Sequence, residues 1–143
     1  MKSILVSACL LGINCKYSGG NNRCAAVEAL REQYILVPVC PEQLGGLPTP
    51  RPPAERQGSA VVNREGIDVT AQYRKGAAEA LRIAELFGCE AAILKSRSPS
   101  CGCGEIYDGT FSGALTPGDG ITAELFKAAG IPVYGESRVG ELL

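Results

Sequence analysis

The sequence predicts an α/β protein built on a three-layer, mainly parallel sheet, with a small β-hairpin insertion. Short apolar runs of strand length alternate along the chain with longer segments of helical spacing. These strand-like runs are almost continuously apolar, which is typical of strands that helices cover on both faces. We therefore expect a Rossmann-like arrangement, and residues 1–143 are expected to form a single domain with its own core.

The first part of the chain is predicted to contain two strands and one helix. Residues 3–7 and 34–39 are the strand-like runs, and the segment 24–33 has the pattern of an amphipathic surface helix. A loop rich in glycine and asparagine is expected between 9 and 22. Glycines and prolines fill 40–57, which is predicted to be a rigid loop, either a plain crossover or an ordered wall over a site.

The second part of the chain continues the alternation. Residues 60–62 and 67–69 flank the turn-like segment Asn63-Arg64-Glu65-Gly66, which predicts a small hairpin. The next helix is expected from Thr70, as N-cap, to Phe87, with Gly88 closing it. The remaining predicted elements are a strand at 91–94, an extended piece around Ile106-Tyr107, a helix from Asp119 or Thr122 to Gly130, a strand at 132–134 and a short helix from Ser137.

Composition excludes several classes of function. No apolar run approaches the roughly 20 residues of a membrane span, and the first residues are too short for a signal peptide. A net charge of −1 argues against nucleic acid as a partner and favours a small molecule. Histidine is absent, which excludes Ser-His-Asp and Cys-His catalysis. We expect a cytoplasmic protein without membrane contact.

The cysteines are the most informative residue type. A reducing cytosol disfavours structural disulfides, so a large set of thiols indicates metal binding or redox chemistry. Cys9, Cys40 and Cys101 each lie just past the end of a predicted parallel strand. Because these strand ends share one edge of the sheet, we expect the three thiols to lie together there. The alternative is that each is a small buried apolar residue.

Three thiolates suit a soft metal or an iron–sulfur cluster, whereas zinc would need a fourth cysteine or a carboxylate. A cubane [4Fe–4S] cluster with three cysteine ligands keeps one iron open as a Lewis acid. Cys103 is a candidate fourth ligand or a redox partner of Cys101, and Cys15 and Cys24 flank one loop as a switchable thiol pair. Cys89 is assigned to packing.

Polar residues beside the strand ends are candidate catalytic or binding groups. Glu42 follows one strand-end cysteine and could act as a general base, or simply be a solvated loop carboxylate. Ser98 and Ser100 could donate a proton, or cap a turn. Lys95 and Arg51 could face the site or lie on the surface.

Several motifs together resemble the DUF523 family, which includes the thiouracil desulfurases. The resemblance covers nearly the whole chain and rests on Ser7-Ala8-Cys9-Leu10-Leu11-Gly12, Cys40-Pro41-Glu42, Gly46-Leu47-Pro48-Thr49-Pro50-Arg51-Pro52-Pro53-Ala54-Glu55, Lys95-Ser96-Arg97-Ser98-Pro99-Ser100-Cys101-Gly102 and Ile106-Tyr107-Asp108-Gly109.

The resemblance implies an oxygen-sensitive [4Fe–4S] cluster held by three cysteines, which match Cys9, Cys40 and Cys101. In that scheme the fourth iron binds the sulfur of a thiocarbonyl. Glu42 matches the catalytic glutamate and Ser98 the catalytic serine. Cys103 is not needed as a ligand, because three thiolates suffice.

We therefore expect a non-redox desulfidase that removes sulfur from a thiouracil-type base or related thiocarbonyl compound as hydrosulfide. Ser100, Lys95 and Arg51 are expected to contact the small-molecule substrate. Two other classes stay open at this point. The chain could be a thiol/disulfide redox protein, or a zinc-binding structural module.

Overall fold

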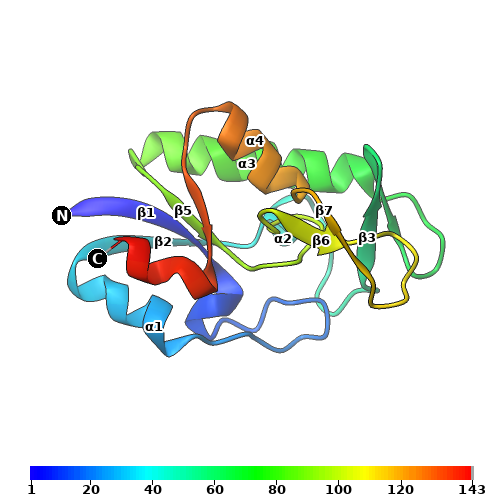
Figure 1. Ribbon diagram of the computed structural model, residues 1–143, viewed down its shortest axis with the longest axis horizontal. Helices are drawn as coiled ribbons and strands as arrows, with labels where there is room; N and C mark the ends of the chain where they lie inside the picture. The colour runs from blue at the N-terminus through cyan, green and yellow to red at the C-terminus, as the bar shows by residue number, and fades with distance from the viewer. Residues whose placement is uncertain (143) are drawn as a thin grey trace.

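A four-stranded parallel sheet forms the centre of the computed structural model, which describes residues 1–142. The strand order is β2-β1-β5-β8, as Figure 1 shows. The strands are β1 (Lys2–Ser7), β2 (Tyr34–Val39), β5 (Ala92–Leu94) and β8 (Val133–Gly135). All neighbouring pairs run parallel, so the predicted strands and their direction are confirmed.

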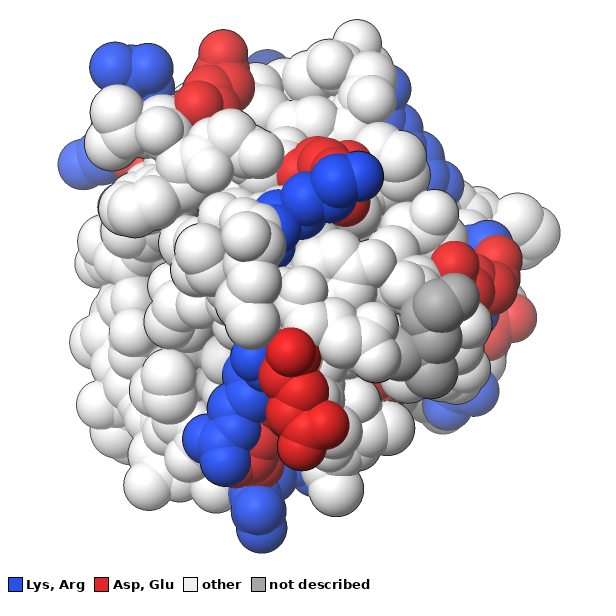
Figure 2. Space-filling model, turned by 90° about the vertical axis from the view of Figure 1, so that its left-hand side faces the viewer, with Lys and Arg blue, Asp and Glu red and all other residues white. Residues whose placement is uncertain are grey.

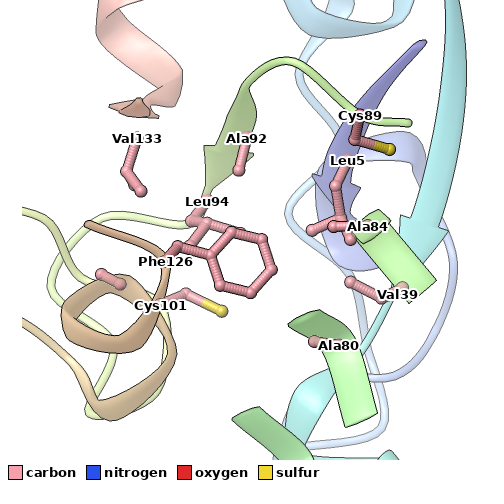
Figure 3. Packing of buried hydrophobic residues seen from close by; sticks show 11 residues of the cluster. Leu5, Val39, Ala80, Ala84, Cys89, Ala92, Leu94, Cys101, Phe126 and Val133 are labelled. Atoms are coloured by element: carbon pink, nitrogen blue, oxygen red, sulfur yellow. The ribbon is translucent and has the colours of Figure 1, made fainter. Parts of the chain in front are cut away.

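Helical elements cover both faces of the sheet and complete the predicted three layers (Figure 1). On one face Leu5 packs in a core with Phe126, and the two appear together in Figure 3. On the other face Ile4 packs in a core with Val27, because successive strand residues point to opposite sides. The first layer is α3 (Thr70–Leu86) and α4 (Ile121–Ala128), and the second is α1 (Ala25–Glu28) with the 3₁₀ segments η2 (Ala29–Glu32) and η3 (Glu136–Leu142).

The predicted hairpin between 60–62 and 67–69 is present: Val62 and Asp68 form an antiparallel bridge, and the N–H groups of Asn63 and Val69 donate to the backbone oxygens of Ile67 and Val61, both at 2.9 Å. The structure adds a longer ladder that was not predicted, between β3 (Ala54–Gln57) and β4 (Ala60–Asn63). The proline run ends at Pro53, so the backbone from Ala54 onward can join a ladder, and Gly58 turns the chain at a φ of 62°. A second hairpin pairs β6 (Glu105–Tyr107) with β7 (Leu115–Pro117).

Three helix predictions need correction at their ends. The helix expected over 24–33 becomes a 3₁₀ segment after Glu28. Thr70 is the first helical residue of α3 and not its N-cap, since Asp68 accepts the N–H of Thr70 and the Thr70 hydroxyl accepts the N–H of Val61. The last helix is the 3₁₀ segment η3, which starts one residue before the predicted Ser137.

The segment predicted as a loop after Cys40 begins with the short helix α2 (Pro41–Leu44), which packs on α3 through two glycines. A Cβ on Gly76 would lie 1.8 Å from the Pro41 carbonyl oxygen, and one on Gly45 would lie 1.9 Å from that of Gln72. The two backbones therefore touch directly. This contact fixes the residues of α2 against the start of α3.

The side of the molecule that carries both chain ends shows no large patch of one charge sign. In Figure 2, acidic and basic side chains lie next to one another there, with a broad uncharged area between them. Within residues 1–142, no helix is long and apolar enough to cross a membrane. The opposite edge of the sheet, where the strands end, holds the functional candidates.

Candidate active site

A cavity of about 680 Å³ opens at the carboxyl ends of β1, β2 and β5. Cys9, Cys40 and Cys101 all line it, as their positions after parallel strands predict. Cys9 lies on the 3₁₀ turn η1 (Ala8–Leu11), Cys40 lies between β2 and α2, and Cys101 follows β5. The fold thus brings three thiols from distant parts of the sequence to one site.

The thiols of Cys9 and Cys101 are buried and close enough to interact. Burial raises the pKa of the Cys101 thiol to about 12, despite a hydrogen bond with Ser7. Burial also raises the pKa of Cys9, which has a hydrogen bond with Asn22 and feels the charges of both other thiols. Figure 3 shows Cys101 beside the ring of Phe126 at the border of the core.

Cys40 lies in a different electrostatic environment. A hydrogen bond from the Cys15 thiol is the largest cause that lowers the pKa of Cys40 to about 6, and the charge of Arg51 acts in the same direction. The same contact raises the pKa of Cys15. Cys15 also lines the cavity, so it is part of the site together with Cys40, whereas Cys24 is not among the lining residues. No disulfide joins any of these thiols.

Glu42 is held by two donors that reach the same carboxylate oxygen. Arg51 Nε donates to Oε1 at 3.0 Å and the Tyr73 hydroxyl donates to it at 2.7 Å. Burial raises the pKa of the Tyr73 phenol, so this group stays protonated and remains a donor. Tyr73 lies on the buried face of α3, where an aromatic residue is typical of ordinary core packing, so no sequence signal marked it as part of the site.

Arg51 is built into the site wall. Its side chain is only 4% exposed. Besides Glu42, it donates to the backbone oxygen of Pro48 at 3.2 Å and of Cys15 at 2.9 Å, and to the Thr49 hydroxyl at 3.0 Å. Arg51 also lines the cavity, so its expected contact with a substrate stays a prediction beside these bonds to the protein.

The Ser98 hydroxyl lines the cavity and also caps a turn. Its oxygen accepts the N–H groups of Ser100 and Cys101, both at 3.1 Å. Its own hydrogen takes no part in these bonds and stays available for donation. Ser100 lies outside the cavity lining, because it is fully buried and its hydroxyl bonds with that of Thr122 at 2.8 Å.

Of the remaining predicted residues, one lines the cavity and two lie outside its lining. Lys95 lines the cavity, and its ammonium lies 3.3 Å from Glu136. Cys103 does not line it, since its sulfur contacts the backbone oxygen of Val133 at 3.6 Å. Cys89 packs in the core between the sheet and α3, as assigned.

Comparison with known proteins decides the family. A model of the 2-thiouracil desulfurase family matches residues 4–138. The chain belongs to this family. An uncharacterised protein of Bacillus subtilis strain 168, YbbK, is 43% identical over 150 residues, which span 98% of this chain and 99% of that protein. The solved structure of the [4Fe-4S]-dependent thiouracil desulfidase TudS is similar, with a TM-score of 0.93 and 45% identity over 99% of this chain and 95% of the other.

In this 2-thiouracil desulfurase family member, aromatic side chains line the same cavity as the thiols. They include Phe111, which has a φ of 57°, a strained value for a bulky residue. The Glu55 carboxylate holds this loop by accepting the N–H groups of Gly109 at 3.0 Å and Phe111 at 3.1 Å. The guanidinium of Arg64 lies 5.7 Å from the Phe111 ring centre.

The spacing of the side chains bears on the kind of metal centre. Within residues 1–142, no three or more Cys, Asp or Glu side chains gather closely enough to hold a single metal ion. A cubane cluster takes each cysteine on a different iron, so its ligands lie further apart than those around one ion. The three cavity thiols therefore fit a cluster by their number, their softness as ligands and their common cavity.

Proposed function

We propose that this protein is a [4Fe–4S]-dependent desulfidase that cleaves the C–S bond of thiouracil-type bases without net redox change. The observation that carries the proposal is the meeting of three strand-end thiols with Glu42 and Ser98 in one cavity. The net reaction consumes the thiolated base and water and yields the oxo base and hydrosulfide. The likeness to TudS, whose name states this cofactor and activity, supports it.

Cys9, Cys40 and Cys101 would hold the cluster. The pKa of Cys9 and that of Cys101 are raised because burial leaves their thiolates without compensating charge, and iron supplies that charge. With three cysteine ligands, a bound cluster provides an open iron that acts as a Lewis acid on a thiocarbonyl sulfur. The ligand set contains no histidine because the chain has none.

The protein's own groups supply the proton transfers. Glu42 removes a proton from the water whose oxygen attacks the ring carbon that carries sulfur. The hydroxyl of Ser98 relays a proton: its hydrogen, free of the two bonds that its oxygen accepts, is donated to the sulfur as the C–S bond breaks, and the proton that Glu42 took from water restores the hydroxyl. The ring carbon keeps the oxygen of water, and the sulfur leaves as hydrosulfide.

The remaining cavity residues suit a small planar substrate. A volume of about 680 Å³ lies in the range of small-molecule and cofactor pockets. The ring of Phe111 offers an apolar surface to a pyrimidine, and Lys95 offers a cation near the thiols. Arg51 contributes by holding Glu42 in place.

The test is anaerobic purification followed by iron, sulfide and zinc analysis and a turnover assay with thiouracil. We expect about four irons and four sulfides per chain, and equal amounts of uracil and hydrosulfide. Cys9→Ser, Cys40→Ser and Cys101→Ser should each lose iron, whereas the control Cys24→Ser, outside the cavity lining, should keep it. Zinc in place of iron, or thiol oxidation without uracil formation, would support the structural or redox alternative.

A further inference from the structure

The two oxygens of the Glu42 carboxylate are bonded differently. Both donors, Arg51 Nε and the Tyr73 hydroxyl, reach Oε1. Among residues 1–142, no hydrogen bond to Oε2 is present. The side chain of Glu42 is 17% exposed and lines the cavity. One oxygen is therefore fixed by the protein while the other is left for the cavity.

The two donors are themselves held rigidly, and they come from separate elements. Tyr73 belongs to α3 and is 2% exposed, packed among Val61, Ala77 and Ile121. Arg51 comes from the proline-rich segment, where two backbone oxygens, one hydroxyl and the sulfur of Cys40, at 3.9 Å, accept the other N–H groups of its guanidinium. A carboxylate turned away from this orientation would lose both bonds at once.

Within the part of the chain that the structure describes, Glu42 is the one hydrogen-bond partner of the Tyr73 hydroxyl. Phenylalanine would pack equally well at this position. Burying a hydroxyl without a hydrogen bond costs folding free energy, so the bond to Glu42 compensates for the burial of the Tyr73 hydroxyl. Because Glu42 and Tyr73 are 31 positions apart, the bond depends on the close contact of α2 with α3 at Gly45 and Gly76. The bond from Tyr73 and the contact of α2 with α3 thus both help to set the orientation of the Glu42 carboxylate.

We propose that Tyr73 and Arg51 are positioning residues that clamp Oε1 of Glu42 and so present Oε2 as the atom that takes the proton from water. This inference rests on the proposed function, in which Glu42 is the base. A base must lie within hydrogen-bond reach of its proton in the right direction, and misplacement by about 1 Å can cost 10²-fold in rate. The clamp acts on the rate of the chemical step, through the orientation of Glu42.

The test compares Tyr73→Phe with wild type as anaerobic, cluster-loaded enzymes acting on thiouracil. We expect kcat to fall by roughly 10- to 100-fold, with KM and iron content unchanged, because the variant removes one oxygen atom and keeps the shape. In a Glu42→Gln background the same change should cause no further loss. The matched control is Tyr34→Phe, which removes a tyrosine hydroxyl bonded to the Leu142 backbone oxygen, away from the cavity.

Arg51→Lys gives a second route to the same question, since it keeps the charge but loses the Nε–H. It should show the same fall in kcat and the same lack of further effect in the Glu42→Gln background. Wild-type kcat in Tyr73→Phe, an equal loss in Tyr34→Phe, or losses that multiply in the double variant would each overturn the clamp. Failure of the proposed function looks different: wild type would then bind no iron or release no uracil and hydrosulfide from thiouracil, so the two failures are distinguishable.

Discussion

Two walls of the cavity each carry a cysteine and a candidate catalytic residue, but different contacts hold the two walls in place. The Cys40 wall consists of Cys40, Glu42 and Arg51, backed by Tyr73, and side-chain hydrogen bonds hold it together. The Cys101 wall is the loop 95–104, and hydrogen bonds to its backbone N–H groups hold it, including those that the Ser98 hydroxyl accepts. There the Gly102 N–H donates to the Ser98 carbonyl oxygen at 2.8 Å, and Gly102 is packed too tightly to carry a side chain.

The difference determines how function can be separated from folding. On the Cys40 wall, charge and hydrogen bonds define the site. A substitution there can therefore remove one functional atom and keep the shape of the side chain. On the Cys101 wall the oxygen of Ser98 both caps the turn and faces the cavity, so the group that reacts also holds the loop. Activity and stability should therefore separate on the first wall and change together on the second.

The largest effect is expected for Glu42→Gln on the Cys40 wall. The amide keeps the shape and an acceptor for Arg51 and Tyr73 but removes the basic oxygen. Turnover should fall by about 10²–10⁴-fold, while iron content and thermal unfolding stay as in wild type. Steady-state kinetics and an iron assay measure this. Loss of iron would instead make Glu42 a ligand or structural group, and near-full activity would place water activation elsewhere.

On the Cys101 wall, Gly102→Ala should act through the fold. Its new Cβ would lie 2.6 Å from Ile106 Cγ2 and 2.7 Å from the Ser98 carbonyl oxygen. We expect a loss of about 1–3 kcal/mol in the free energy of unfolding, together with lower iron content and activity. Chemical denaturation measures it against the control Gly135→Ala, whose nearest neighbour would be at 3.8 Å. A stable but inactive Gly102→Ala enzyme would contradict the contrast between the walls.

Ser98→Ala should lower both stability and turnover, each by less than the two variants above. Removing the oxygen leaves two backbone N–H groups without their acceptor, at a cost of about 1 kcal/mol of stability. Turnover should fall less than in Glu42→Gln if water can replace the hydroxyl, and the two losses should not add if they serve one proton path. Kinetics of the single and double variants, with unfolding curves, decide this. Unchanged stability would show that the cap is dispensable.

The smallest effect is expected for Cys103→Ser. Cys103 belongs to the loop of the Cys101 wall, but it lies outside the cavity lining, against the Val133 backbone. Iron content should equal that of wild type, and stability should stay within about 0.5 kcal/mol. Reconstitution beside Cys101→Ser, which should lose iron, provides the comparison. Markedly less iron in Cys103→Ser would mean that the ligand set differs from the one proposed.

Local sequence patterns determined the architecture and part of the site. Apolar runs such as Ile4-Leu5-Val6 predicted the parallel strands correctly, because burial on both faces imposes a continuous apolar pattern. The rule that ligands sit at the carboxyl ends of such strands then predicted that Cys9, Cys40 and Cys101 share one site, and all three line the cavity. The same patterns failed for β3 and α2, since a four-residue element among prolines and glycines has no readable period.

What only the tertiary structure decided is which way the polar side chains face and what they meet. Arg51 turns inward to Glu42, Cys15 meets Cys40, Tyr73 reaches the carboxylate, and Ser100 is buried against Thr122. Periodicity fixes the direction of a side chain only relative to its own helix or strand. Contacts between residues far apart in the chain depend on how elements pack, here on the close approach of α2 and α3 that two glycines allow.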